Sequence, residues 1–289
     1  MKKYVDVDTL KYMLYDVHNL EGLLKRERFQ DHDKESLDMF LDSSKDFADK
    51  ELFPFIKEMD EKPAHYKDGT VYVHDQVKTM MYKGGELGII SAPFDYEDGG
   101  MQIPLVVYTA ATYILDAANN HLPGYAGLTQ GAAELIIHFA NKELNETYVP
   151  NMLSGQWGGT MCLTEPQAGS SLSDIVTKAK PTSDGYYKLS GQKIFISGGD
   201  NQFAENIVHL VLARVEGAPK GTKGISLFVV PKNRPDSSGS LISNDITTVA
   251  DFQKLGQRGY CTTHLGFGDA DDCRGWLVGD ENQGLNYMF

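Results

Sequence analysis

The sequence predicts an α+β protein of more than one domain, in which an all-α helical N-terminal part is followed by an all-β part folded as a barrel or sandwich. Through the first half of the chain, apolar residues recur at steps of three and four, the stripe of an amphipathic helix. Beyond about Ser154, short β-branched runs bounded by turn residues replace that pattern. Strands and helices do not alternate, which argues against a βαβ sheet. A length of 289 residues leaves room for roughly two domains.

The helices of the first half are predicted from this periodicity and, from residue 105 on, from mostly apolar segments. One begins near Asp31 and should end or kink at Pro54. A second spans 74–82 and should stop at the Gly84-Gly85 pair, in the manner of a C-cap. The Pro, Asp and Gly content of the next stretch predicts a loop. That loop covers 91–104, and further helices are expected at 105–118, 124–140 and 142–153.

Turn signals place the strands of the second half. Asp184-Gly185 and Ser190-Gly191 lie between short β-rich runs and predict hairpins. Two more strands are expected at 206–215 and 224–230, joined by a turn-prone linker. Near Leu285 a new apolar helix begins just before the chain stops, so we expect a truncated product.

The charge balance limits the class of partner. The chain has 27 Lys and Arg residues against 40 Asp and Glu residues, a net charge of −13, so it repels polyanions at long range. No basic cluster offsets this repulsion, and we expect no nucleic acid partner. Charged residues interrupt the N-terminal stretch, and no run approaches the ~18 apolar residues of a transmembrane helix. We therefore expect neither a signal peptide nor membrane insertion.

Cysteine and histidine usage narrows the class further. Cys162, Cys261 and Cys273 are an odd number without CxxC spacing, which is more typical of a reduced cytoplasmic protein than of a disulfide framework. The eight histidines show no metal-ligand spacing. The phosphate-loop, HExxH and GxSxG patterns are absent as well, so we expect no metal site.

The stretch MCLTEPQAGSS, residues 161–171, has the composition of a ligand-binding loop. Pro166 pushes the residue before it into an extended conformation, so the chain turns outward at the end of an apolar strand. Gly169 lets the main chain approach a ligand closely. Ser170 and Ser171 offer hydroxyls and amides suited to phosphate oxygens. A flat polar heterocycle that carries a diphosphate would use all of these groups.

A second stretch, QKIFISGGD at 192–200, carries an aromatic, an aliphatic and a hydroxyl residue on a predicted strand. Phe195 and Ser197 should point the same way, so that one packs against a ring while the other bonds to it. Taken alone, the stretch is more typical of an ordinary hairpin with an inward Phe.

Together the two stretches resemble the flavin-binding signature of the acyl-CoA dehydrogenase family. MCLTEPQAGS is followed, after one hairpin, by GQKIFISGGD. ELGIISAPFDYEDGG upstream and LGQRGYCTTHLGFGD downstream extend the resemblance over nearly the whole chain, most weakly over the first 75 or so residues. The long N-terminal segment and the residues GTMCLTEP are most similar to the larger bacterial branch of the family, which includes methylthiopropionyl-CoA dehydrogenases.

The resemblance implies a subunit of three domains that binds FAD between its middle domain and a C-terminal four-helix bundle. Residues 1–157 would be the helical domain, with 1–75 as an extra segment, 158–280 the β domain, and 281–289 the start of a bundle that is otherwise missing. The FAD contacts carried over by position are the backbone of Met161 and Leu163 and the hydroxyl of Thr164 at the pyrimidine edge, Gly169 and Ser170 at the diphosphate, and Phe195, Ile196 and Ser197 beside the isoalloxazine. Ser170 would also contact the CoA of the substrate.

The resemblance also implies an activity, the α,β-dehydrogenation of an acyl-CoA thioester to a 2-enoyl-CoA, with electrons passed to an electron-transfer flavoprotein. The family's general base is a glutamate of the bundle, expected beyond Phe289. No catalytic residue is therefore assigned within the chain, which we predict to be inactive alone and a homo-oligomer when full length. Glu165 belongs to the Thr-Glu-Pro turn and is predicted to be structural.

Two alternatives stay open. The chain could be a non-catalytic flavin-binding or assembly half that needs a partner chain. It could also belong to an acyl-CoA oxidase-like flavoenzyme of the same fold. The chain departs from the family pattern in two places. Phe195 and Ser197 stand where many members carry Trp and Thr, and Ser171 stands where many carry Asp.

Overall fold

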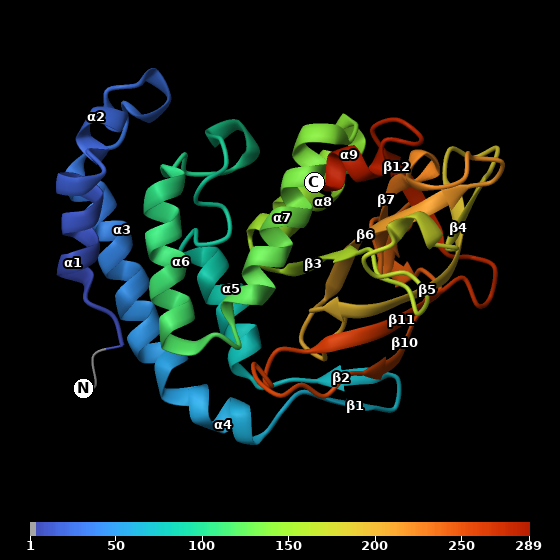
Figure 1. Cartoon of the computed structure of the whole chain (residues 1–289), viewed down its shortest axis with the longest axis horizontal. Coiled ribbons are helices and arrows are strands. Elements are labelled where there is room, and N and C mark those ends of the chain that lie inside the picture. Colours follow the sequence, from blue (N-terminus) through green and yellow to red (C-terminus); the bar gives the residue numbers. More distant parts are fainter. Residues whose placement is uncertain (1–3) are drawn as a thin grey trace.

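A computed structural model describes residues 4–289. Figure 1 shows helices packed side by side across one half of the molecule and a β domain across the other, with α7 and α8 between them. The predicted fold class, helices followed by a β domain, is confirmed.

The longest of the N-terminal helices α1 to α4 is α3 (Lys34–Phe47). Its start is fixed by Asp33, whose carboxylate accepts the Ser36 N–H in a capping box. Pro54 lies in a 3₁₀ turn that re-aims the chain, as predicted. The other N-terminal segments are α1 (Val7–Tyr12), the π-helical turn η1 (Met13–Val17), α2 (Leu20–Leu24), the 3₁₀ turn η2 (Glu27–Phe29), the π-helical turn η3 (Ala48–Leu52), the 3₁₀ turn η4 (Phe53–Phe55) and α4 (Ile56–Glu61), of which α1 and η3 contact α3.

Helix α5 (Gln76–Glu86) runs through the Gly84-Gly85 pair, so the predicted stop at these glycines was wrong. The pair serves close packing instead. A Cβ on Gly85 would lie 2.0 Å from the Ser154 carbonyl oxygen, so only glycine lets the two backbones meet there. The left-handed residue that follows the helix is Gly88, with φ of 73°.

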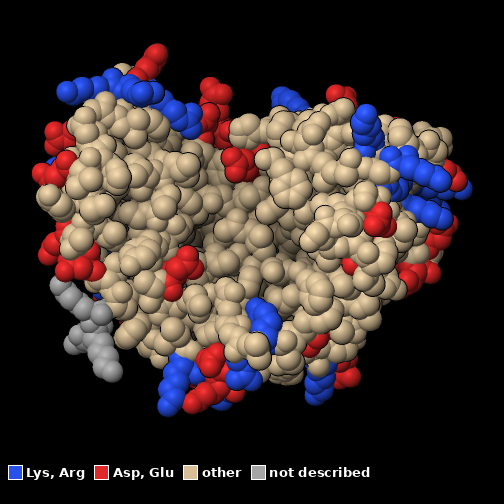
Figure 2. All heavy atoms as spheres, in the orientation of Figure 1, with Lys and Arg blue, Asp and Glu red and all other residues tan. Residues whose placement is uncertain are grey.

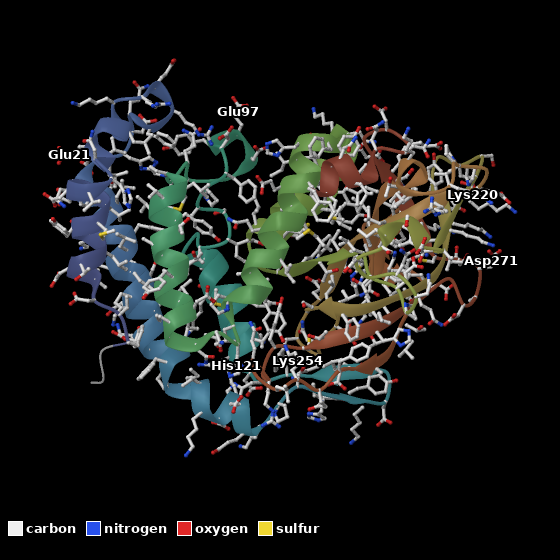
Figure 3. All side chains as sticks on the ribbon, viewed as in Figure 1. Glu21, Glu97, His121, Lys220, Lys254 and Asp271 are labelled. Atoms are coloured by element: carbon white, nitrogen blue, oxygen red, sulfur yellow. The ribbon has the colours of Figure 1, made fainter. Side chains whose placement is uncertain are left out.

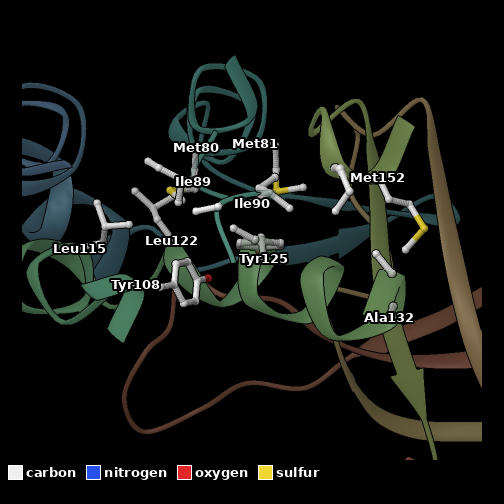
Figure 4. Close-up of a cluster of buried hydrophobic side chains, with 14 of the residues drawn as sticks. Met80, Met81, Ile89, Ile90, Tyr108, Leu115, Leu122, Tyr125, Ala132 and Met152 are labelled. Carbon is white, nitrogen blue, oxygen red and sulfur yellow. The ribbon is translucent and has the colours of Figure 1, made fainter. Parts of the chain in front are cut away.

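The remaining helices form the core of the helical half. They are α6 (Leu105–Asn119), α7 (Pro123–Phe139) and α8 (Lys142–Leu153), close to the predicted ranges, and the loop before them contains only a 3₁₀ turn, η5 (Tyr96–Asp98). Figure 4 shows Met80, Leu115 and Tyr125 meeting in this core from α5, α6 and α7.

A short hairpin interrupts the helical half, which the periodicity did not predict. Strands β1 (His65–Lys67) and β2 (Thr70–Tyr72) pair through the Asp68-Gly69 turn, where both residues have positive φ. The hairpin packs against β10 of the β domain and therefore joins the two halves.

The main sheet of the β domain has the order β10-β11-β5-β12-β7-β6-β3, with β4 paired to β5 and β6. The Asp184-Gly185 hairpin is confirmed, whereas Ser190-Gly191 lies inside β5. Gly191 is needed there because a Cβ would lie 2.5 Å from Thr177 Oγ1. The strands are β3 (Trp157–Cys162), β4 (Lys178–Pro181), β5 (Tyr187–Ser197), β6 (Asn206–Val215), β7 (Ser226–Pro231), β8 (Asn233–Pro235), β9 (Leu241–Ser243), β10 (Ile246–Asp251), β11 (Thr262–Phe267) and β12 (Arg274–Val278).

Helix α9 (Gly284–Met288) follows the last strand, as predicted, and packs on β7 and α7. Within residues 4–289, no helix has both the length and the apolar character needed to cross a membrane.

Candidate functional site

The fold brings the two motifs side by side. After β3 ends at Cys162, the chain runs along β5: the Ile194 N–H donates to the Thr164 carbonyl at 2.9 Å. The Lys193 ammonium donates to the Leu163 carbonyl at 3.0 Å. Two stretches about 30 residues apart in the sequence therefore form one continuous surface.

Glu165 holds the turn between them. Its carboxylate accepts hydrogen bonds from Lys193 Nζ at 2.8 Å, from Thr177 Oγ1 at 2.6 Å and from the Val176 N–H at 2.7 Å. Burial alone would raise the pKa of Glu165, but Lys193 and these donors hold it below its usual value. Burial lowers the pKa of Lys193, while Glu165 opposes that shift. With every lone pair engaged and no access to solvent, Glu165 is structural, as predicted.

The groups of this surface that face outward have no partner in the protein. Gly169 and Ser170 are exposed, and Thr164 and Ser197 are half-buried. Within the described chain, the side-chain hydroxyls of Thr164, Ser170, Ser171 and Ser197 make no hydrogen bond to protein. A Cβ on Gly169 would meet nothing within 4 Å, so the space over this backbone is open. These unengaged donors and acceptors, next to an open backbone, fit the edge and phosphates of a flat heterocyclic cofactor.

Phe195 departs from the simple strand alternation we expected. It has a left-handed φ of 57° at an irregularity in the β5–β11 pairing. Its ring is 55% exposed and packs against Phe252 with ring centroids 4.5 Å apart. The neighbouring Ile196 side chain is buried in the β-domain core and its carbonyl accepts from Thr263 Oγ1 at 3.0 Å. Only the backbone of Ile196 can therefore face a ligand.

Helix α7 faces this surface from the helical half. Gly131 lies next to Met161, whose Cε would be 3.4 Å from a Cβ on that glycine. Gly127 of the same helix faces open space. Figure 2 shows the molecule hollowed between the two halves, with few charged side chains in the hollow.

The segment 252–261 closes one end of this region. His121 Nδ1 accepts the Gly259 N–H at 3.1 Å, and Figure 3 shows His121 beside Lys254. Burial lowers the pKa of His121, which favours the neutral, accepting imidazole. Tyr260 packs edge-on against Tyr125, with ring centroids 4.5 Å apart.

A groove of about 500 Å³ lies on the β domain, beginning where the 161–174 loop ends at Ile175. Four basic residues line it, Lys178, Lys180, Lys188 and Arg214, against two acidic ones, Glu216 and Asp271, of which Asp271 pairs with Lys188 at 2.6 Å. Figure 2 shows basic side chains gathered at this end of the molecule. The groove gives a locally positive field in a chain whose net charge is −13.

The remaining chemistry is limited. All three cysteines are buried and free, and burial raises the pKa of Cys162 to about 12, so its thiolate is not available as a nucleophile. In the part of the chain that the structure describes, no group of three or more His, Cys, Asp or Glu residues could hold a metal ion.

Sequence reasoning missed several residues that build the site. Lys193 and Asp200 lie within the second motif but were assigned no role, and their partners follow from strand pairing. Phe252 and Tyr260 lie outside both motifs and reach the site only through loop packing. A buried lysine in a strand was the one available signal, since lysine at a core position requires a charged partner.

Comparison with known proteins agrees with this geometry. The family model "Acyl-CoA dehydrogenase, N-terminal domain" matches residues 34–156, and the model of the middle domain matches residues 160–270. The 3-methylmercaptopropionyl-CoA dehydrogenase of Ruegeria pomeroyi is 39% identical over 84% of this chain and 41% of its own length. A butyryl-CoA dehydrogenase of Syntrophomonas wolfei is 34% identical over 97% of this chain and 48% of its own length.

Solved structures show the same fold. An acyl-CoA dehydrogenase complexed with FAD from Bacillus anthracis superposes with a TM-score of 0.71 at 22% identity, over 90% of this chain and 40% of the other. This chain spans less than half the length of the two curated relatives above. With both family models covering most of its residues, the chain belongs to the acyl-CoA dehydrogenase family.

Proposed function

We propose that this chain supplies the helical and middle domains of an FAD-dependent acyl-CoA dehydrogenase. The observation that carries the proposal is the joined surface of Thr164 and Ser197, whose hydroxyls are unengaged while the residues behind them, Glu165 and Lys193, are saturated. A solved protein of the same fold is described as complexed with FAD.

The roles of the residues follow from their chemistry. When bound, FAD accepts a hydride equivalent from the substrate. Thr164 and Ser197 would hydrogen-bond to the polar edge of the ring and orient it. Phe195, packed on Phe252, would cover the ring and exclude water. The open backbone at Gly169 and the Ser170 hydroxyl would hold the diphosphate.

The acyl-CoA would bring further negative charge, which the overall field of the molecule repels. The lysine-lined groove beside Ile175 offsets this repulsion locally and suits the phosphates of CoA.

We assign the base that removes the α proton to no residue of the chain. Glu165, the buried carboxylate beside the site, cannot reach a substrate because its oxygens are engaged. The 289-residue chain should therefore show no acyl-CoA turnover alone. An electron-transfer flavoprotein as acceptor, a homo-oligomeric full-length state and a cytoplasmic location remain predictions.

The test is a titration of the purified chain with FAD, followed by visible absorption before and after denaturation. We expect bound flavin that is released on unfolding, and weaker binding in Thr164→Ala and Ser197→Ala. Gly256→Ala is the matched control, because a Cβ there meets nothing and its backbone is unstrained. Absence of binding at saturating FAD would contradict the proposal, and acyl-CoA-dependent dye reduction by the chain would contradict its predicted inactivity.

A further inference from the structure

Asp200 is a fully buried carboxylate and the last residue of the second motif, in the segment Ser197-Gly198-Gly199-Asp200. Its Oδ2 accepts from Thr248 Oγ1 of β10 at 2.8 Å. Its Oδ1 pairs with Lys232, which follows β7. Oδ2 also accepts the Val71 N–H of β2 at 3.3 Å. One carboxylate therefore contacts elements of both halves of the molecule.

The two glycines before Asp200 leave the turn conformationally free. Gly198 has a φ of 68°, which disfavours other residues. A Cβ on Gly199 would lie 2.1 Å from Thr263 Oγ1, so this position also requires glycine. On its Ser197 side, the turn is held by the Gly198 N–H, which donates to the Cys261 carbonyl at 3.0 Å. On the other side it needs an anchor, because glycine loses more backbone freedom on folding than any other residue.

The residues after Asp200 reinforce the same anchor. Gln202 exchanges two hydrogen bonds with the backbone of Val73, at 2.8 and 2.9 Å. The Asp200 carbonyl accepts the Cys261 thiol at 3.2 Å. The segment that carries Ser197 is therefore hydrogen-bonded to Cys261, just before β11, and to Val73, just after the β1–β2 hairpin of the helical half.

We propose that Asp200 is a positioning residue, which fixes the turn Ser197–Gly199 through Lys232, Thr248 and the Val71 amide and thereby sets the place of the Ser197 hydroxyl. The positioning of the turn stands on the contacts above. Its consequence for cofactor binding rests on the proposed function.

The first measurement is hydrogen exchange on the 289-residue chain and its Asp200→Asn variant, without added ligand. Removal of the charge leaves Lys232 without its counter-ion and weakens the bond from Val71. We expect the amides of 197–201 and 71–73 to exchange about ten times faster or more, with smaller changes elsewhere. Asp49→Asn is the matched control: Asp49 also pairs with one lysine, Lys45, and accepts one hydroxyl, that of Tyr4 at 2.7 Å, but lies among the N-terminal helices. Unchanged exchange at 197–201 in Asp200→Asn would overturn the proposal.

The second measurement is the FAD dissociation constant, with the double variant Asp200→Asn/Lys232→Met as a separator. This variant contains no uncompensated ammonium, so its thermal stability should recover toward the wild type. If Asp200 positions the turn, the faster exchange at 197–201 and an FAD affinity weakened about fivefold to tenfold persist in it. If the exchange at 197–201 and the FAD affinity both return to wild-type values together with the thermal stability, the role of Asp200 is merely structural. If the wild-type chain binds no FAD while the exchange difference is present, the flavin function fails and the positioning of the turn stands.

Discussion

One motif, MCLTEPQAGSS, contains two regions of opposite character. In its first part, Glu165 is buried and accepts hydrogen bonds from a lysine, a hydroxyl and backbone amides. In its second part, Gly169 to Ser171 are exposed and their side chains contact no hydrogen-bonding partner within residues 4–289. The difference teaches that the conspicuous acid of the motif builds the scaffold, while the inconspicuous small residues are the ones available to a ligand.

The largest expected effect comes from breaking the buried part. Glu165→Ala leaves the Lys193 ammonium buried without a counter-charge, and we expect the free energy of unfolding to fall by about 3 to 5 kcal/mol. Chemical denaturation measures the loss. Lys188→Ala, which breaks the exposed pair with Asp271, is the control and should cost no more than about 1 kcal/mol. Equal losses in the two variants would contradict the structural role of Glu165.

The same carboxylate should make stability depend on pH. The folded pKa of Glu165 lies below the ordinary value of 4.5, so its contribution is complete above that value and is lost as the pH falls through the folded pKa. We expect the wild type to lose more unfolding free energy than Glu165→Gln when denaturation is measured at successive pH values below about 4.5. Parallel pH profiles of the two proteins would show that the carboxylate is not stabilised by folding.

A smaller effect should separate two tyrosines that touch each other. Tyr125 Oη accepts the Cys261 N–H at 3.0 Å, whereas Tyr260 Oη is buried and has no hydrogen-bond partner among residues 4–289. Tyr125→Phe leaves a buried N–H unpaired, and we expect it to lower the free energy of unfolding by about 1 to 3 kcal/mol. Tyr260→Phe removes an unpaired hydroxyl and should be neutral or stabilising in the same denaturation assay. The reverse order would show that Tyr260, and not Tyr125, carries the hydrogen bond.

The exposed part should behave in the opposite way, with little effect on stability and a measurable one on binding. Ser197→Ala should change the free energy of unfolding by less than about 0.5 kcal/mol, because its hydroxyl bonds to no protein group. Its FAD dissociation constant should rise about threefold to tenfold in the absorption titration. A large loss of stability without weaker binding would place Ser197 in the scaffold.

The smallest structural change is Gly169→Ala. A Cβ there has open space and φ is not positive, so the free energy of unfolding should stay the same or rise by a few tenths of a kcal/mol, about what a more restricted unfolded chain contributes. If a ligand approaches this backbone, the added methyl group should weaken FAD binding. Unchanged FAD affinity in Gly169→Ala would remove this position from the site.

The sequence determined the class of the fold and the positions of most elements. Mostly apolar segments located α6 and α7 within a residue or two, and the range expected for α8 agrees with the structure. The Asp184-Gly185 turn was recognisable because an Asp-Gly pair between two β-rich runs is itself a hairpin signal. The family resemblance identified the two motifs. In the structure they lie side by side, joined by the hydrogen bond from the Ile194 N–H to the Thr164 carbonyl.

Tertiary structure alone decided what glycines and charges do. The pairs Gly84-Gly85 and Ser190-Gly191 predicted a helix stop and a turn, yet Gly85 lies close to Ser154 and Gly191 close to Thr177, both from other elements. The pairing of Glu165 with Lys193, and of Asp200 with Lys232, depends on which strands lie next to each other. The local sequence pattern indicates backbone preference and burial, because both depend on residues that are near in the chain. The close approach of two backbones, or a buried ion pair, depends instead on which residue folding places opposite.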